Sequence, residues 1–115
     1  MKVILLPSTP LSSFKKFIDE KTPFIVQFIP ISFDQLKTEL SNNEIISYIR
    51  HKPTAELLKK YFNIKEIQGE YIYDENDMIY VISSPIRPTK SGEDVQLKEN
   101  DLLIVRIIVA RGIWI

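Results

Sequence analysis

The sequence has no cysteine and only three glycines, and its formal charges sum to zero. Without thiols, the chain forms no disulfide, offers no cysteine ligand to a structural zinc and has no thiol nucleophile. The absence of cysteine also favours an intracellular, cytoplasmic protein. Because the net charge is zero, no general field attracts a polyanion, so we expect no binding to long nucleic acid. An anion would have to bind at a local basic pocket.

Long apolar runs are also missing. The longest, from Leu102 to Ala110, is interrupted by Arg106 and is far shorter than the roughly 20 residues that a membrane-spanning helix needs. The first apolar run, Lys2–Leu6, stops at Pro7 and is too short for a signal peptide. We therefore expect no membrane partner. The 115 residues, 44% of them hydrophobic, fit one globular domain spanning 1–115.

Hydrophobic periodicity predicts five strands, at Lys2–Leu6, Phe24–Ile29, Tyr71–Tyr73, Met78–Ser84 and Leu102–Val109. The near-continuous apolar character of the last one predicts burial on both of its faces. The polar turn 74–77 separates two of these segments and is typical of a hairpin.

Two helices are predicted between the strands. Ser32, followed by Gln35 three residues later, has the capping-box pattern that begins a helix. Pro53 suits the first turn of a second helix, which we expect to end near Asn63. The segment 12–21 is compatible with a short helix or an irregular crossover. The fold class is therefore α/β, a single domain with a mixed, mostly five-stranded sheet flanked by helices.

His51, the only histidine, precedes Pro53 and so lies at a predicted helix N-terminus. Unpaired backbone N–H groups favour an anion there, and Arg50 and Thr54 add a charge and a hydroxyl. Because ligand sites gather beyond strand C-termini, we expect the loop 7–10 to converge with this helix start. A histidine in that setting can protonate a leaving oxygen, although an ordinary solvated histidine explains the same pattern. A lone histidine without a carboxylate cluster disfavours a metal site, so no metal or other cofactor is expected.

Each of the other candidate residues has two interpretations, one as a ligand contact and one as an ordinary structural residue. Ser8, Thr9 and Ser12 offer hydroxyls to a phosphate or ribose, or cap the segment that follows. Arg87, in the long loop 85–94, either reaches a phosphate or is simply exposed. Three tyrosines are suited either to stacking on bases or to packing across strands, and packing is the more common role of such residues. They are Tyr71, Tyr73 and Tyr80.

The order of these features resembles the viral type III anti-CRISPR ring nucleases and their bacterial CRISPR-associated relatives. The most specific part is the run Ile46–Leu58, and the strand Asp77–Ser83 leading to Arg87 supports it. The resemblance extends from Lys2 to about Ala110.

The resemblance implies a homodimer that binds cyclic tetra-adenylate across its interface and cleaves it without metal. His51 would be the general acid on the 5′-oxygen, and Arg87 would hold the ring or the developing charge. Ser83 and Gln68 occupy positions where the family contacts its ligand. The protein would switch off type III CRISPR signalling, in the host cytoplasm if it is viral.

The sequence departs from the family pattern at three positions. Arg50 stands where the family has glycine, Pro7 where it has asparagine, and Ile67–Gln68 where it often has an Asn-Arg pair. Arg50 is a candidate to replace the missing charge. Two other interpretations remain open at this stage: a non-catalytic domain that binds or sequesters a cyclic oligonucleotide, and a viral interaction protein without a nucleotide ligand.

Overall fold

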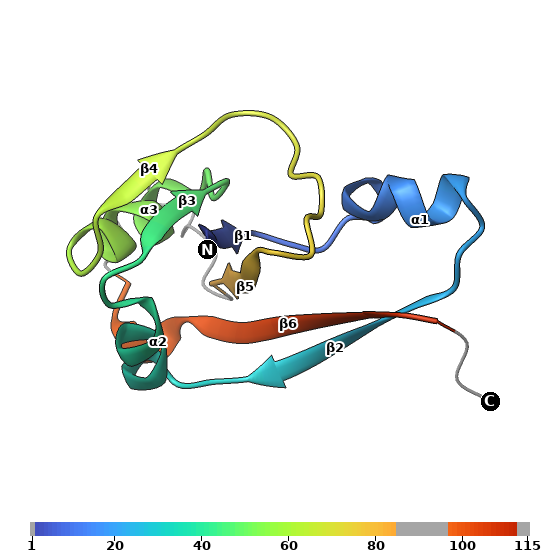
Figure 1. Cartoon of the computed structure of the whole chain (residues 1–115). Helices are drawn as coiled ribbons and strands as arrows, with labels where there is room; N and C mark the ends of the chain where they lie inside the picture. The colour runs from blue at the N-terminus through green and yellow to red at the C-terminus, as the bar shows by residue number, and fades with distance from the viewer. Residues whose placement is uncertain (1, 85–96, 113–115) are drawn as a thin grey trace.

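The computed structural model describes residues 2–84 and 97–112, which form one α/β domain around a six-stranded mixed sheet (Figure 1). The strands are β1 (Lys2–Leu6), β2 (Phe24–Pro30), β3 (Glu44–Ser47), β4 (Ile64–Glu66), β5 (Met78–Ser83) and β6 (Leu103–Arg111). The α-helices are α1 (Lys15–Asp19), α2 (Phe33–Leu40) and α3 (Lys52–Lys59), and the 3₁₀ turns are η1 (Leu11–Phe14) and η2 (Glu99–Asp101).

The sheet has the strand order β2-β6-β5-β1-β3-β4. β1 pairs in parallel with both β3 and β5, and β3 pairs in parallel with β4. β6 runs antiparallel to β5 and to β2. The four parallel strands therefore end at one edge, where the loops that follow β1, β3 and β4 come together.

Helices α2 and α3 cover one face of the sheet. Ser32 caps α2 as predicted, because its Oγ accepts a hydrogen bond from the Gln35 backbone N–H at 3.0 Å. Pro53 lies in the first turn of α3, also as predicted. The buried residues of the two helices pack on the sheet in a cluster that includes Leu36, Leu58 and Val3. Over the described residues, no helix is both long and apolar enough to cross a membrane.

The opposite face is covered unevenly. The segment between β4 and β5 crosses part of it and buries Tyr71 against Ile4 and Ile46 (Figure 1). At the far end, α1 and η1 pack through an aromatic cluster in which the rings of Phe17 and Phe24 lie 5.1 Å apart. Phe28, at 51% exposure, lies on the same face beyond these covers.

Polar side-chain contacts connect α2 to two strands of the sheet. Glu39 of α2 accepts hydrogen bonds from Arg106 Nη1 at 2.9 Å and from the Tyr80 hydroxyl at 3.2 Å. Burial, followed by the nearby Glu39 charge, raises the pKa of Tyr80 to about 12, so its hydroxyl remains a donor at neutral pH. Arg106, which interrupts the apolar strand, is thus paired with a carboxylate.

The prediction missed two strands of the sheet, β3 and β4, and placed a strand at 71–73 where the structure has none. β3 and β4 have four and three residues, too short for a periodic signal, and they exist because β1 offers β3 a parallel partner. The predicted hairpin is wrong: 71–73 is not a strand, and β5 pairs with β1 and β6 instead. The Tyr-Ile-Tyr segment alternates as a strand does, because Tyr71 packs on the sheet while Ile72 faces solvent, but its backbone is irregular.

Two smaller predictions also change. β6 is not buried on both faces, since Leu103 is 60% and Ile108 43% exposed. α3 ends at Lys59 rather than near Asn63. All three tyrosines pack in the interior or against neighbouring side chains, as the plainer of their two roles predicts; they are Tyr71, Tyr73 and Tyr80.

We predict that Leu58→Ala lowers the free energy of unfolding by about 2–5 kcal/mol, because this fully buried side chain leaves a cavity between α3 and the sheet. Urea denaturation followed by circular dichroism measures the change. Leu11→Ala is the matched control, since Leu11 is 71% exposed and should change stability by less than about 0.5 kcal/mol. Equal losses in the two variants would contradict the assigned core.

Candidate functional site

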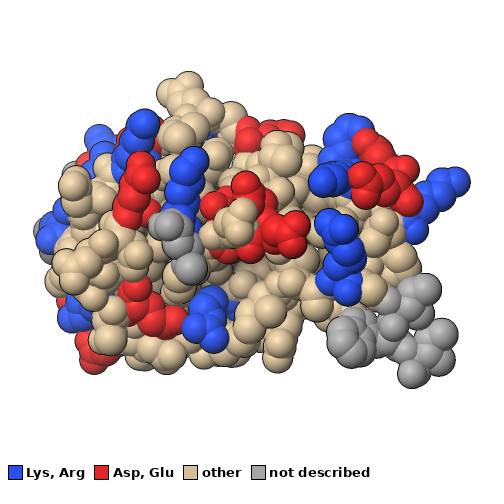
Figure 2. Space-filling model, in the orientation of Figure 1, with Lys and Arg blue, Asp and Glu red and all other residues tan. Residues whose placement is uncertain are grey.

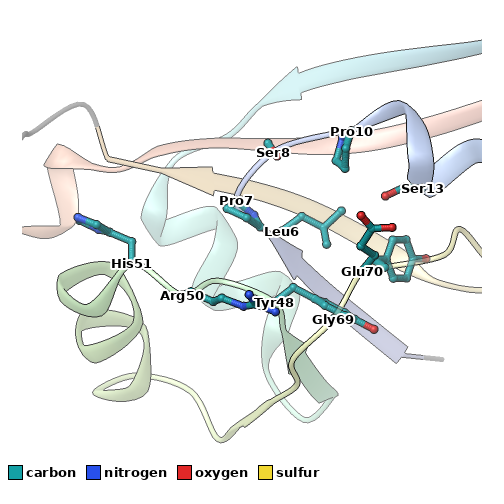
Figure 3. A pocket seen from close by; sticks show the side chains of 11 residues that line it. Leu6, Pro7, Ser8, Pro10, Ser13, Tyr48, Arg50, His51, Gly69 and Glu70 are labelled. Atoms are coloured by element: carbon teal, nitrogen blue, oxygen red, sulfur yellow. The ribbon is translucent and has the colours of Figure 1, made fainter.

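A pocket of about 400 Å³ lies where the loops after β1, β3 and β4 meet (Figure 3). Its volume is within the roughly 300–1,000 Å³ typical of small-molecule sites. The predicted convergence of the loop 7–10 with the start of α3 is confirmed. The residues that line the pocket are Leu6, Pro7, Ser8, Pro10, Ser13, Tyr48, Arg50, His51, Gly69, Glu70 and Tyr71.

His51 is the N-cap of α3, with extended backbone angles. Its side chain does not cap the helix; its Nδ1 lies 2.8 Å from the Thr54 Oγ1 instead. This contact leaves Nε2 as the ring nitrogen that can serve a ligand. When the ring is protonated, Nδ1–H donates to Thr54 and Nε2–H is available as an acid.

The turn from β3 to α3 is held by two hydrogen bonds. The buried Ser47 accepts a bond from the Ile49 N–H at 3.1 Å, and the Tyr48 N–H donates to the Leu5 carbonyl at 2.9 Å. The turn thereby ties the pocket wall to β1. Arg50 follows it, exposed, and its side chain lies between Tyr48 and His51 (Figure 3).

Ser13 contributes a hydroxyl that sequence reasoning missed. The residue is 2% exposed, lines the pocket, and its Oγ has no hydrogen-bond partner within the described ranges. Its backbone is anchored at both ends, because its N–H donates to the Pro10 carbonyl and its carbonyl accepts from the Tyr73 N–H. A buried unpaired hydroxyl costs free energy, and a bound polar ligand would remove that cost.

Tyr48 and Tyr71 form an aromatic wall, with ring centroids 5.7 Å apart and nearly perpendicular planes. Tyr71 donates its hydroxyl hydrogen to Asp77 at 2.7 Å. Burial and this bond raise the pKa of Tyr71 above its ordinary value. Tyr71 therefore remains neutral and supplies an apolar surface rather than acid–base chemistry.

Glu70 places a carboxylate in the pocket, which sequence reasoning also missed. The preceding Gly69 has a φ of +114°, a conformation that strongly favours glycine. Figure 3 shows Glu70 near the side formed by Pro10 and Ser13, with His51 at the opposite side. The signal in the sequence was the Gly-Glu pair before a buried tyrosine, but only the fold brings that pair to the pocket.

Of the residues predicted to meet a ligand, His51, Arg50 and Ser8 line the pocket. Thr54 is 1% exposed and acts on His51 rather than facing the cavity, which corrects its expected role as a ligand contact. The other four described candidates do not line the pocket: Thr9, Ser12, Gln68 and Ser83. Ser13 replaces Ser12 because the turn of η1 directs the second serine inward. Arg87 and its loop lie outside the described residues.

The charge around the site is mixed. Figure 2 shows basic and acidic side chains interspersed over one face of the molecule, with acidic groups gathered near its centre. In the described part of the chain, no group of three His, Asp or Glu side chains is placed to hold a metal ion. Arg50, His51 and the N–H groups at the start of α3 are the groups at this site that suit an anion.

Comparison with known proteins bears on the fold. No protein-family model matches the sequence, and no curated protein matches it significantly. Among solved structures, the fold is similar to B116 of Sulfolobus turreted icosahedral virus, with a TM-score of 0.60 and 16% identity. The similarity covers 93% of this chain and 98% of that one. The chain thus has an α/β fold that a viral protein shares.

We predict that Thr54→Val releases the His51 ring without disturbing the fold, because valine keeps the volume but cannot bond Nδ1. The ¹⁵N chemical shift of Nδ1 in long-range ¹H–¹⁵N spectra should move, while the lost bond costs about 1 kcal/mol of stability. Thr38→Val, on α2, is the control and should leave the ring unchanged. An unmoved Nδ1 resonance in Thr54→Val would show that the contact does not orient the ring.

Proposed function

We propose that this protein is a metal-independent ring nuclease that binds cyclic tetra-adenylate and cleaves it to linear oligoadenylates ending in a 2′,3′-cyclic phosphate. It would thereby switch off type III CRISPR signalling. The observation that carries the proposal is that His51, Arg50 and Ser13, whose hydroxyl has no hydrogen-bond partner among the described residues, line one pocket. The sequence resemblance supplies the substrate, and the fold shared with a viral protein fits the viral members of that family.

The pocket contains groups suited to this reaction. Arg50 and the start of α3 supply positive potential for a phosphate, and the Tyr48–Tyr71 wall supplies an aromatic surface for a base. In the proposed step the ribose 2′-oxygen attacks the adjacent phosphorus and the bond from phosphorus to the 5′-oxygen breaks. His51 gives its Nε2 proton to the departing oxygen.

The size of the pocket favours two copies acting together. A volume of about 400 Å³ accommodates part of a ring of four nucleotides, but not the whole ring. A two-fold symmetric dimer would place two such pockets around a symmetric ring.

An apolar patch next to the pocket is a suitable dimer interface. Leu6, at the pocket, is in register with Val81 of β5, which is in register with Val105 of β6. Phe28, in register with Ile107, and Leu103, in register with Ser83, lie in the rows on either side of it on the same face and are 51% and 60% exposed. We define these residues as the β5–β6 patch: Val81, Val105, Leu103 and Phe28. A second copy packed on the patch would bring its own pocket close to the first.

We predict that the wild-type protein cleaves cyclic tetra-adenylate in the presence of EDTA and that His51→Ala slows cleavage by about 10²–10⁴-fold, because the leaving oxygen loses its acid. Chromatography of the products under single-turnover conditions measures the rate. Arg50→Ala should weaken binding, since a charge near the phosphate is removed. Tight binding without turnover would instead indicate a sequestering domain. Absence of binding would contradict the proposal and favour an interaction protein.

We predict that Leu103→Asp converts the dimer into a monomer, because a charge in the β5–β6 patch would be buried without a partner. Sedimentation velocity at several concentrations measures the state. Ile108→Asp is the matched control: it is 43% exposed and lies on the same strand, but on the opposite face. A monomeric wild-type protein, or equal dissociation of both variants, would contradict this interface.

A further inference from the structure

The pocket holds one carboxylate, that of Glu70, among its described lining residues. In a pocket for a polyanion, a carboxylate opposes binding, so its presence calls for a chemical reason. We propose that Glu70 is the general base that takes the proton of the attacking 2′-hydroxyl. This inference rests on the proposed ring-nuclease function and adds a second catalytic residue to it.

The other lining side chains do not suit this task. The Arg50 guanidinium is permanently protonated, and Tyr71 already donates its hydroxyl hydrogen to Asp77. The Ser13 Oγ has no hydrogen-bond partner in the described structure, so no base is placed to take its proton. His51 is assigned to the leaving group and must begin the step protonated. Glu70 is the remaining lining group able to accept a proton.

The placement of Glu70 fits in-line displacement. The attacking oxygen and the leaving oxygen lie on opposite sides of phosphorus in such a reaction, so the base and the acid must face each other across it. Figure 3 shows Glu70 beside Ser13 at one end of the pocket and His51 at the other end, with the His51 ring directed away from Glu70. In-line reaction at a phosphate held by Arg50 therefore requires the exposed His51 ring to rotate toward the pocket.

The backbone holds Glu70 at this position. On one side of it, the Ile67 N–H donates to the Ser47 carbonyl at 3.0 Å, which ties this segment to β3. On the other side, Tyr71 is 6% exposed and packs on the sheet. Gly69, with its positive φ, makes the turn between these anchors. The backbone of Glu70 therefore lies on a turn anchored on both sides, and its exposed side chain lines the pocket from there.

The step balances. The 2′-hydroxyl proton passes to the Glu70 carboxylate as the 2′-oxygen forms its bond to phosphorus. The bond to the 5′-oxygen breaks, and this oxygen receives a proton from His51 Nε2. The products are a 2′,3′-cyclic phosphate and a 5′-hydroxyl, with no change of oxidation state. Water exchanges protons with the two side chains before the next turnover.

The test is Glu70→Gln, measured under single-turnover conditions with cyclic tetra-adenylate and EDTA across the pH range 4–9. We expect the rate to fall by about 10²–10⁴-fold while affinity is unchanged or tighter, because the substitution removes a base and also a negative charge. The acidic limb of the bell-shaped pH–rate profile should disappear and the alkaline limb should remain. A purely structural role would weaken binding and leave the shape of the profile unchanged.

Glu44→Gln is the matched control, because Glu44 is exposed at the opposite end of β3. Glu70→Ala with added acetate is the second variant, and partial recovery of the rate supports the role even if Glu70→Gln folds poorly. A Glu70→Gln rate within threefold of wild type, or no recovery by acetate in a folded Glu70→Ala, overturns the inference. If the wild-type protein itself does not cleave the ring, the proposed function fails first, and the inference fails with it.

Discussion

The parallel pairing of β1 with both β3 and β5 is the constraint on which the rest of the structure depends. Val3 and Leu5 are fully buried and Ile4 nearly so, because helices cover one face of β1 and the segment after β4 covers the other. A strand buried on both faces satisfies its backbone groups only with a neighbour on each side. β3 and β5 are those neighbours, and their parallel direction aligns the strand ends at one edge.

The pocket is a direct result of that alignment. The loops that leave β1, β3 and β4 begin at the same edge, so residues distant in the chain, such as Ser8, His51 and Glu70, line one cavity. The buried polar bonds behind it are local: Ser47 holds the turn and Thr54 holds the histidine ring. Neither hydroxyl lines the pocket; each contacts a residue of the segment that does. An accurate active site commonly depends on such supporting contacts.

The pocket is lined by one arginine and one glutamate, which lie in different parts of it. Arg50 follows β3, whereas Glu70 follows β4 and lies near Ser13, so one positive and one negative side chain line different parts of the pocket. This local arrangement matters more than the net charge, which is zero. Under the proposed function, this arrangement would attract one phosphate locally, without a general field around the protein.

Local patterns in the sequence determined β1, the caps of α2 and α3, and the place of His51 at a helix start, because each depends on neighbouring residues alone. Ser32 with Gln35, and Pro53 in a first turn, act within a single helical turn. The short strands β3 and β4, the burial of Tyr71 in an irregular segment, and the inward turn of Ser13 depended on the tertiary structure. Pairing with β1 and packing against the sheet stabilise them, and those partners are distant in the chain. His51 was therefore visible in the sequence, whereas its Thr54 contact, the buried Ser13 hydroxyl and the carboxylate of Glu70 became visible only in the folded protein.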